Sequence, residues 1–147
     1  MIKLLFVCHG NICRSPMAEC VMRQLVKDAG RTDIEVASAA TSTEEIGNSI
    51  HRGTVRKLTE MSVPMHRHHA HQITPAEAKT CTLIFGMDSA NMRNLRRMLP
   101  SSLHDRLRFL PDYACLGRDI ADPWYTGNFD ATYNDVLACC TALLKTL

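Results

Sequence analysis

Apolar residues form two kinds of pattern along the chain, short continuous runs and positions repeated at helical spacing. Short, nearly continuous apolar runs are typical of strands buried on both faces of a parallel sheet. Four such runs predict strands at residues 2–7, 34–38, 82–87 and 106–110. Elsewhere apolar positions recur at helical spacing, which predicts helices over residues 16–29, 50–61, 74–79, 90–98 and 129–147. Residues 39–48 are predicted to be a polar loop, and residues 111–127, which show neither pattern, a long loop.

Residues at the ends of these elements support the predicted bounds. Ser15 as N-cap before Pro16 is a typical start of a helix, and Gly30 is a typical end. Thr74, followed three residues later by Glu77, is the pattern of a capping box and predicts the start of the short helix.

The alternation of strands and helices predicts an α/β fold. Right-handed crossovers make it a doubly wound, four-stranded parallel sheet with helices on both faces. The length of 147 residues fits a single domain over residues 1–147. Ligands of such sheets bind beyond the carboxyl ends of the strands, which directs attention to the loop after the first strand.

Composition and charge narrow the function classes. The net charge of +2 is too small a surplus to indicate nucleic acid or an anionic membrane as a partner. The apolar start is too short for a signal peptide, and no later run reaches membrane-spanning length. We therefore expect a cytoplasmic protein whose seven cysteines, an odd number, are reduced thiols.

Residues 8–15, between the first strand and the first helix, have the composition of a phosphate-binding loop. The amides of a curled loop and of a helix N-terminus attract anions, and Gly10 and Asn11 tolerate the left-handed backbone that a curl needs. Arg14 adds a planar fork for two phosphate oxygens. Cys8 stands at the start of this cradle, where the thiolate is favoured and can attack phosphorus.

Over nearly its whole length the chain resembles the low-molecular-weight protein tyrosine phosphatases. The likeness is most specific at residues 7–19, which match that family's phosphate loop and first helix, and at residues 122–125, and it continues through residues 38–42, 68–74 and 87–91. The resemblance implies a phosphotyrosine phosphatase I-like fold and a cysteine-dependent phosphoric monoester hydrolase. Such an enzyme hydrolyses phosphotyrosine and small aryl phosphates through a phosphocysteine intermediate and needs no cofactor.

The departure of a phenolate is helped by a proton donor. The residues alone leave four candidates in and after the long loop, although the Pro that follows Asp122 makes it attractive; the four are Asp112, Asp119, Asp122 and Asp130. The resemblance selects Asp122 as the general acid, beside Cys8 as nucleophile and Arg14 as phosphate clamp. It also implies that phosphate binding and support of the loop involve His9, Gly10, Asn11, Ile12, Cys13, Ser15 and His68.

Trp124 and Tyr125 occupy the position of the family's aromatic wall, against which a substrate ring can stack. Many relatives have a second aromatic residue in the loop after residues 38–39. This chain has residues 43–46 there, without an aromatic, and Ile46 is the candidate for that side of the pocket.

The histidines at positions 66, 68, 69 and 71 look like a metal-binding tract. No cysteine or carboxylate accompanies them at a suitable spacing, and the family needs no metal, so none is expected. Relatives usually have Arg at the position of His71, which puts a local structural salt bridge in doubt.

Cys13 shares the curled loop with Cys8. The resemblance implies that these two thiols can form a reversible disulfide that protects the nucleophile from over-oxidation.

Three alternative functions remain open. Arsenate reductases on this scaffold need a closely spaced relay pair of cysteines, which Cys81 and Cys115 do not provide. Protein arginine phosphatases typically have Thr where this chain has Ile12. A non-catalytic phosphotyrosine-binding module would lose the nucleophile, the arginine or the acid, and all three are present.

The expected partners are a phosphotyrosine-containing protein or peptide as substrate and inorganic phosphate as product. The chain itself is expected to be a monomer or a weak dimer.

Overall fold

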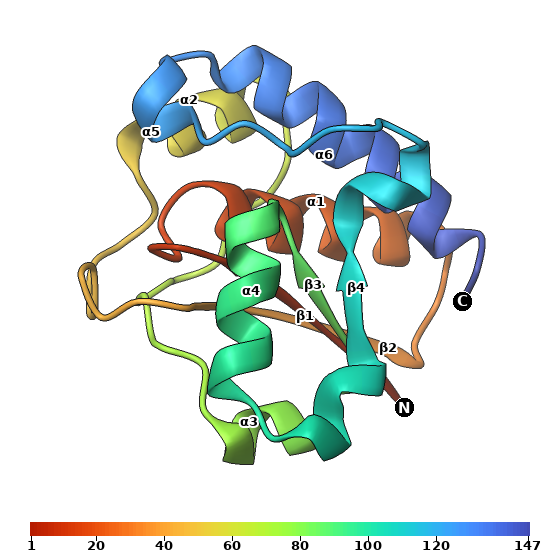
Figure 1. Ribbon diagram of the computed structural model, residues 1–147. Coiled ribbons are helices and arrows are strands. Elements are labelled where there is room, and N and C mark those ends of the chain that lie inside the picture. The colour runs from red at the N-terminus through yellow and green to blue at the C-terminus, as the bar shows by residue number, and fades with distance from the viewer.

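The computed structural model describes residues 1–147 and places one parallel sheet between two layers of helices (Figure 1). The strands, in the spatial order β2-β1-β3-β4, are β1 (Ile2–Cys8), β2 (Ile34–Ala40), β3 (Leu83–Gly86) and β4 (Leu107–Phe109). All neighbouring strands are parallel. The chain runs from β1 outward to β2 and then crosses back to the other side of β1, which confirms the predicted doubly wound, four-stranded sheet.

Helices cover both faces of the sheet (Figure 1). One layer consists of α1 (Arg14–Asp28), α2 (Arg52–Glu60), α5 (Pro123–Thr126) and α6 (Phe129–Leu144). The other consists of α3 (Pro75–Lys79) and α4 (Ser89–Met98). Two short 3-10 helices flank β4, namely η1 (Ser101–Arg106) and η2 (Leu110–Ala114).

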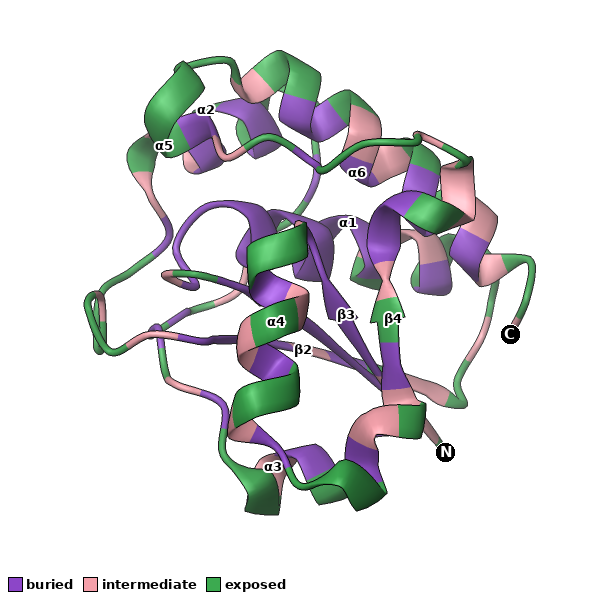
Figure 2. Cartoon of the chain, viewed as in Figure 1, coloured by how far each residue is buried: buried purple, intermediate pink, exposed green.

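The core has one part on each face of the sheet. Leu4 and Phe6 of β1 belong to the larger part, with α1 and α6, and Leu5 and Val7 belong to the smaller part, with α4. Successive strand residues point to opposite faces, so β1 is buried on both sides (Figure 2). This placement explains why the sequence of β1 is apolar at every position after Lys3 rather than alternating.

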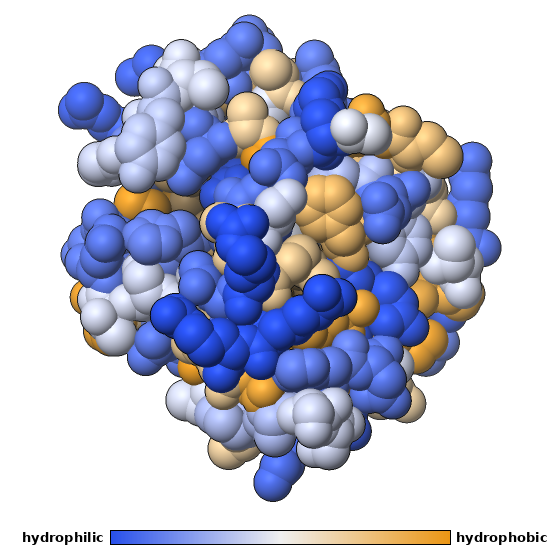
Figure 3. All heavy atoms as spheres, viewed as in Figure 1, coloured by the Kyte–Doolittle hydropathy of each residue, from blue (hydrophilic) through white to orange (hydrophobic).

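The surface over α4 is mostly hydrophilic, and apolar atoms appear on that face in small separate places rather than as one patch (Figure 3). Arg93, Arg96 and Arg97 of α4 are all exposed. None of the helices combines the length and the apolar character needed to cross a bilayer.

The start of α1 differs from the prediction. Gly30 does end the helix region, with a left-handed φ of +68°, but Ser15 is not the N-cap. The helix begins two residues earlier than predicted, at Arg14, and Cys13 at the N-cap makes no side-chain hydrogen bond. The Ser15 hydroxyl contacts the Cys8 sulfur instead, because the first turn of α1 is part of the loop that surrounds that sulfur.

Candidate active site

The loop after β1 lies at the carboxyl edge of the sheet, where the chain leaves β1 for β2 on one side and later returns to β3 on the other. Asn11 in this loop has a φ of +58°, a left-handed conformation that Asn tolerates better than most residues. No side chain of Cys13 caps α1, the Ser15 amide in its first turn points to the Cys8 sulfur, and the positive end of the helix attracts an anion at the same place. The backbone therefore has the shape that a phosphate cradle needs.

Three hydrogen-bonding groups surround the sulfur of Cys8. The Ser15 hydroxyl lies 3.0 Å from Sγ, and the backbone amides of Asn11 and Ser15 donate to Sγ at 3.3 and 3.4 Å. Donors in this arrangement stabilise negative charge on sulfur. The same donors stabilise the thiolate when it attacks phosphorus and when it leaves phosphorus.

Asn11 is fully buried and ties the loop to its surroundings. Its Nδ2 donates to the hydroxyls of Ser15 and Ser38 at 2.8 and 3.0 Å. Its carbonyl oxygen lies 2.7 Å from Nε2 of His68, and its Oδ1 accepts from the amide of His71 at 3.2 Å. The structure thus brings Asn11, Ser15 and His68 together, and it adds Ser38, which the sequence had not singled out.

The guanidinium of Arg14 is buried, with a side chain only 2% exposed, and is held from behind. Nη1 donates at 2.8 Å to Oδ2 of Asp88 and at 2.8 Å to the carbonyl of Ile120, while Nη2 lies 3.5 Å from Oδ2 of Asp122. Burial by itself would lower the pKa of Arg14, but the negative charges of Cys8, Asp88 and Asp122 outweigh it and raise that pKa above its ordinary value.

Asp88 is a functional residue that sequence reasoning missed. Its Oδ1 accepts from the amide of Asn91 at 2.7 Å and so caps α4. That pattern in the sequence signals only the start of a helix. The second oxygen of the same carboxylate meets Arg14 because the carboxyl end of β3 lies beside that of β1.

Asp122 faces the same cavity because it caps a short helix that the sequence did not predict. The amide of Trp124 donates to its Oδ1 at 3.0 Å, and Pro123 occupies the first turn of α5. Trp124 and Tyr125 follow on α5 and are 56% and 81% exposed. The indole of Trp124 lies edge-on against the ring of His51, with centroids 5.5 Å apart.

Ile46 does not reach the cavity. Its side chain is 57% exposed, and the residues that line this side of the cavity are Glu44 and Glu45. Glu44 lies 3.0 Å from Nε2 of His9, and Cγ of Glu45 lies 3.3 Å from the place where a Cβ on Gly10 would be. The part of the cavity lining that comes from the loop after β2 is therefore acidic.

Cys13 also lines the cavity, but it differs from Cys8 in its surroundings. Burial raises the pKa of its thiol to about 12, and the nearby charges of Asp122 and Cys8 act in the same direction. Both cysteines are free thiols in this structure. Cys13 is thus a neutral thiol beside a sulfur that hydrogen bonds prepare for charge.

The four histidines of the tract separate into two pairs. His69 and His71 turn outward: His69 contacts the carbonyl of Gly47 at 3.3 Å, and His71 lies 2.8 Å from Oε2 of Glu77. Glu77 raises the pKa of His71 above its ordinary value. A charge-dependent contact therefore exists at the position where relatives usually have Arg.

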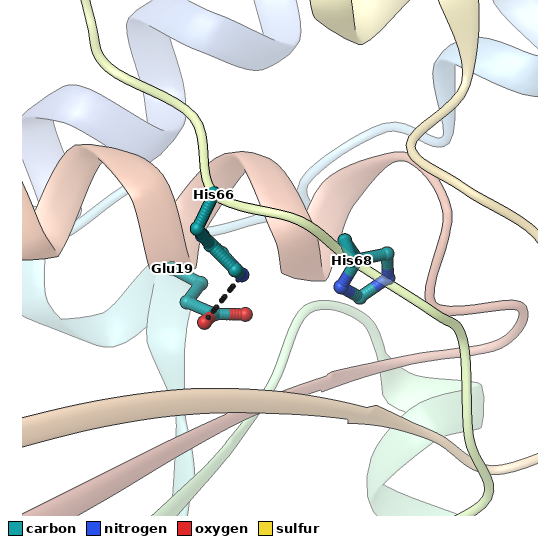
Figure 4. Close-up of side chains that lie close together, drawn as sticks. All are labelled: Glu19, His66 and His68. Carbon is teal, nitrogen blue, oxygen red and sulfur yellow. Dashed lines mark ion pairs between the residues drawn. The ribbon is translucent and has the colours of Figure 1, made fainter.

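His66 and His68 instead lie beside the buried carboxylate of Glu19, which comes from α1 (Figure 4). These three side chains are the residues whose ligand atoms lie close enough together to hold a metal ion. The carboxylate that the sequence seemed to lack lies 47 positions before His66, so spacing within the tract could not reveal it.

A sulfur nucleophile, a buried guanidinium and a carboxylate share one cavity at the N-terminus of a helix. These groups match the needs of phosphoryl transfer from an ester to sulfur, which defines the class of cysteine-dependent phosphatases. The cavity is lined by Cys8, His9, Gly10, Ile12, Cys13, Arg14, Glu44, Glu45, Asp122, Trp124 and Tyr125.

Comparisons with known proteins give the family within that class. The family model "Low molecular weight phosphotyrosine protein phosphatase" matches residues 3–147. The low molecular weight protein-tyrosine-phosphatase PtpA of Staphylococcus aureus is 34% identical over 144 residues, which are 98% of this chain and 92% of PtpA. The chain belongs to the low molecular weight protein tyrosine phosphatase family.

Solved structures agree with this membership. YfkJ from Bacillus subtilis superposes with a TM-score of 0.93 at 34% identity, covering 99% of this chain and 94% of YfkJ. SP-PTP from Streptococcus pyogenes, a low molecular weight protein tyrosine phosphatase, superposes with a TM-score of 0.88 at 38% identity, covering 100% of this chain and 93% of SP-PTP.

Proposed function

We propose that this chain, as a single catalytic domain, hydrolyses phosphotyrosine in two steps, with Cys8 as nucleophile, Arg14 as phosphate clamp and Asp122 as acid and then base. Membership of a family of cysteine-dependent tyrosine phosphatases supports the reaction. The observation that carries the residue roles is the placement of these three side chains around one cavity.

In the first step the Cys8 thiolate attacks phosphorus and forms the S–P bond. The bond from phosphorus to the tyrosine oxygen breaks, and Asp122 gives its proton to that oxygen, so the leaving group departs as a neutral phenol. Arg14 and the loop amides hold the equatorial oxygens, whose negative charge they stabilise in the transition state. Asp88 and the Ile120 carbonyl fix Arg14 from behind at 2.8 Å each.

In the second step water attacks the phosphocysteine. The Asp122 carboxylate accepts a proton from this water, the S–P bond breaks, and inorganic phosphate is released. The sulfur leaves as a thiolate, and the Ser15 hydroxyl at 3.0 Å and the two amides stabilise it. The enzyme returns to its starting state, and the two steps consume only the phosphate ester and water.

A phosphotyrosine side chain is the substrate that the cavity favours. The exposed rings of Trp124 and Tyr125 stand at its rim, where an aromatic substrate can stack. Ile12 lines the cavity as an apolar residue and suits an aryl ester better than the polar phosphoguanidinium of phosphoarginine. A reducing compartment such as the cytoplasm fits this mechanism, because it keeps Cys8 a free thiol.

Phosphate release from a phosphotyrosine peptide tests the proposal, with Cys8→Ser as the control for the nucleophile. Turnover should disappear in Cys8→Ser, since a hydroxyl is a far weaker nucleophile than a thiolate. Turnover that survives in Cys8→Ser, or turnover of a phosphoarginine peptide that exceeds that of phosphotyrosine, would overturn the assignment.

The role of Asp122 is tested with substrates that differ in their leaving groups. Asp122→Asn should slow phosphotyrosine by about 10²–10⁴-fold, the usual contribution of general acid catalysis. An aryl phosphate with a strongly acidic phenol should lose much less in its first step, because its leaving group needs no proton. Equal losses for both substrates would remove Asp122 from the role of acid.

A further inference from the structure

Glu19 is a buried carboxylate that the reaction does not use. It belongs to α1, is 3% exposed, and lies behind the phosphate loop. Oε1 accepts from the hydroxyl of Ser38 at 2.5 Å, and Oε2 lies 2.6 Å from Nη2 of Arg23 and 3.0 Å from Nε2 of His66. The carboxylate thus faces a histidine from a segment distant in the sequence.

His68 has one ring nitrogen available on the same side. Its Nε2 contacts the Asn11 carbonyl at 2.7 Å, and since a carbonyl oxygen can only accept, Nε2 must carry the hydrogen. The neutral ring therefore has its lone pair on Nδ1. A hydrogen bond that fixes the tautomer in this way is typical of metal-binding histidines.

We propose that Glu19, His66 and His68 form a binding site for a divalent transition-metal cation of the Zn²⁺ type. Figure 4 shows His66 directed at the Glu19 carboxylate and His68 presenting a ring nitrogen from the same segment. One carboxylate and two imidazoles are a ligand set that suits zinc or cobalt, with water completing a tetrahedron.

The distances are close to those of a tetrahedral site. Ligands at about 2.1 Å from zinc lie about 3.4 Å from one another. The Glu19 oxygen and the His66 nitrogen are 3.0 Å apart, and the ligand atoms of the three residues all lie within 4.8 Å of each other. The side chain of His66 is 28% exposed. It can therefore make the small movement that brings its nitrogen to coordination distance, and a metal ion can enter the site from solvent beside it.

Two neighbouring groups affect the ligand set. Arg23 is the cation already in contact with Glu19; its Nε and Nη2 also donate to the Val36 carbonyl at 3.3 and 3.0 Å, and its side chain is 45% exposed, so a metal that takes its place leaves it held at Val36 beside solvent. The sulfur of Cys20 lies 3.9 Å from Nδ1 of His66. Nε2 of the same ring is the atom directed at Glu19, so the Cys20 sulfur lies beside the other ring nitrogen and the fourth position is left to water.

Binding at this site acts on the phosphate loop through two connections. Glu19 is joined through the Ser38 hydroxyl to Nδ2 of Asn11, and His68 is joined to the carbonyl of the same Asn11. A cation that draws Glu19 and His68 together changes both contacts, and we expect turnover to fall as the site fills. The effect on turnover rests on the proposed function, whereas the binding itself does not.

Titration of the metal-free protein with Co²⁺ and Zn²⁺ tests the site, using the visible spectrum of cobalt and a chromogenic chelator that competes for zinc. The binding series uses four proteins: wild type, Cys8→Ser, His66→Gln and His69→Gln. Gln at position 66 can still donate to Glu19 but is a poor metal ligand, and His69 lies in the same tract yet contacts only the Gly47 carbonyl. Thermal unfolding of each metal-free variant establishes that it is folded.

The expected result is one equivalent of metal bound by wild type, Cys8→Ser and His69→Gln, with affinity about tenfold or more lower in His66→Gln. The cobalt spectrum should lack a sulfur-to-metal charge-transfer band in the near ultraviolet. If His66→Gln does not fold, this spectrum of the wild type still distinguishes the proposed site from binding to a cysteine. Binding that is lost in Cys8→Ser but kept in His66→Gln would place the metal on the catalytic thiolate and overturn the site. Absence of binding to wild type would overturn it as well.

Discussion

Asp88→Ser tests how the arginine of the site is held. The two carboxylate oxygens of Asp88 accept hydrogen bonds from different partners. Oδ2 accepts from Nη1 of Arg14, and Oδ1 accepts from the amide of Asn91. Serine is an equally good N-cap for α4, but its hydroxyl is too short to reach Arg14. The substitution therefore removes the contact to Arg14 and keeps the helix start.

The expected loss of activity in Asp88→Ser follows from the contact that Arg14 loses and the contacts that it keeps. A hydrogen bond to a charged group contributes about 1.5–3 kcal/mol, and the Asp88 side chain is 20% exposed, so we take about 2 kcal/mol. Nη1 keeps the Ile120 carbonyl at 2.8 Å, but the guanidinium is free to shift toward Asp122. At about 1.4 kcal/mol for each factor of ten, kcat/KM for a phosphotyrosine peptide should fall about 30-fold.

The assay measures kcat/KM, the inhibition constant of inorganic phosphate, and the free energy of unfolding. Phosphate should bind more weakly to Asp88→Ser, because phosphate needs the same guanidinium. Thr74→Ala is the matched control, since it removes the cap of α3, which accepts from the Glu77 amide at 3.2 Å, far from the reaction. This control should lose about 1 kcal/mol of stability and no activity.

Two outcomes would refute the reasoning about Asp88. One is an Asp88→Ser enzyme whose kcat/KM and phosphate affinity stay within about twofold of wild type. The other is an equal loss of activity in Thr74→Ala, which would show that the site responds to any loss of stability rather than to the position of Arg14.

Three further predictions concern Glu44 at the rim of the cavity, the ion pair of His71 with Glu77, and the contact between Gly53 of α2 and Phe129 of α6. Glu44→Gln should reduce, by a few-fold at low salt, any preference for peptides with Lys or Arg beside the phosphotyrosine, measured as a ratio of kcat/KM values. Because Glu77 raises the pKa of His71, their contact stabilises the fold below about pH 6.5 and is lost as pH rises through the folded pKa. His71→Gln should therefore lower Tm at about pH 6 and leave it unchanged at about pH 9. Gly53→Ala should lower the free energy of unfolding by about 1–3 kcal/mol in denaturant titrations, since the added Cβ would lie 2.2 Å from the Phe129 ring.

The parts of the site that could be predicted from the sequence are those whose residues are close together in the sequence. Cys8 and Arg14 belong to one loop between a buried strand and a helix, so their spacing and the Gly and Asn between them were enough to predict a phosphate cradle. The doubly wound parallel sheet could also be predicted, because parallel strands joined by helices admit few arrangements, but the order of its strands was not predicted. Asp122 needed the family resemblance, since Pro123 alone could not distinguish it from the other acids nearby.

The parts that could not be predicted depend on contacts between distant segments. Asp88 and the Ile120 carbonyl lie 74 and 106 positions from Arg14, and no local pattern connects them. The acidic part of the pocket was missed because the exposed loop of residues 43–46 lines the cavity with Glu44 and Glu45 and not with Ile46, its one large apolar residue. A polar loop carries no period that would tell which of its side chains point where.

The shape of the phosphate loop is set largely by residues outside it. A left-handed Asn costs about 1 kcal/mol or more relative to the usual helical region, and Asn11 adopts it at φ +58°. Its side chain and carbonyl compensate through contacts to Ser15, Ser38, His68 and the His71 amide, all in a fully buried setting. Because groups of the protein itself make these contacts, they hold the cradle in shape and reduce the free energy that substrate binding must supply to order it. The same contacts make the loop sensitive to Glu19, which reaches Asn11 through a single hydroxyl.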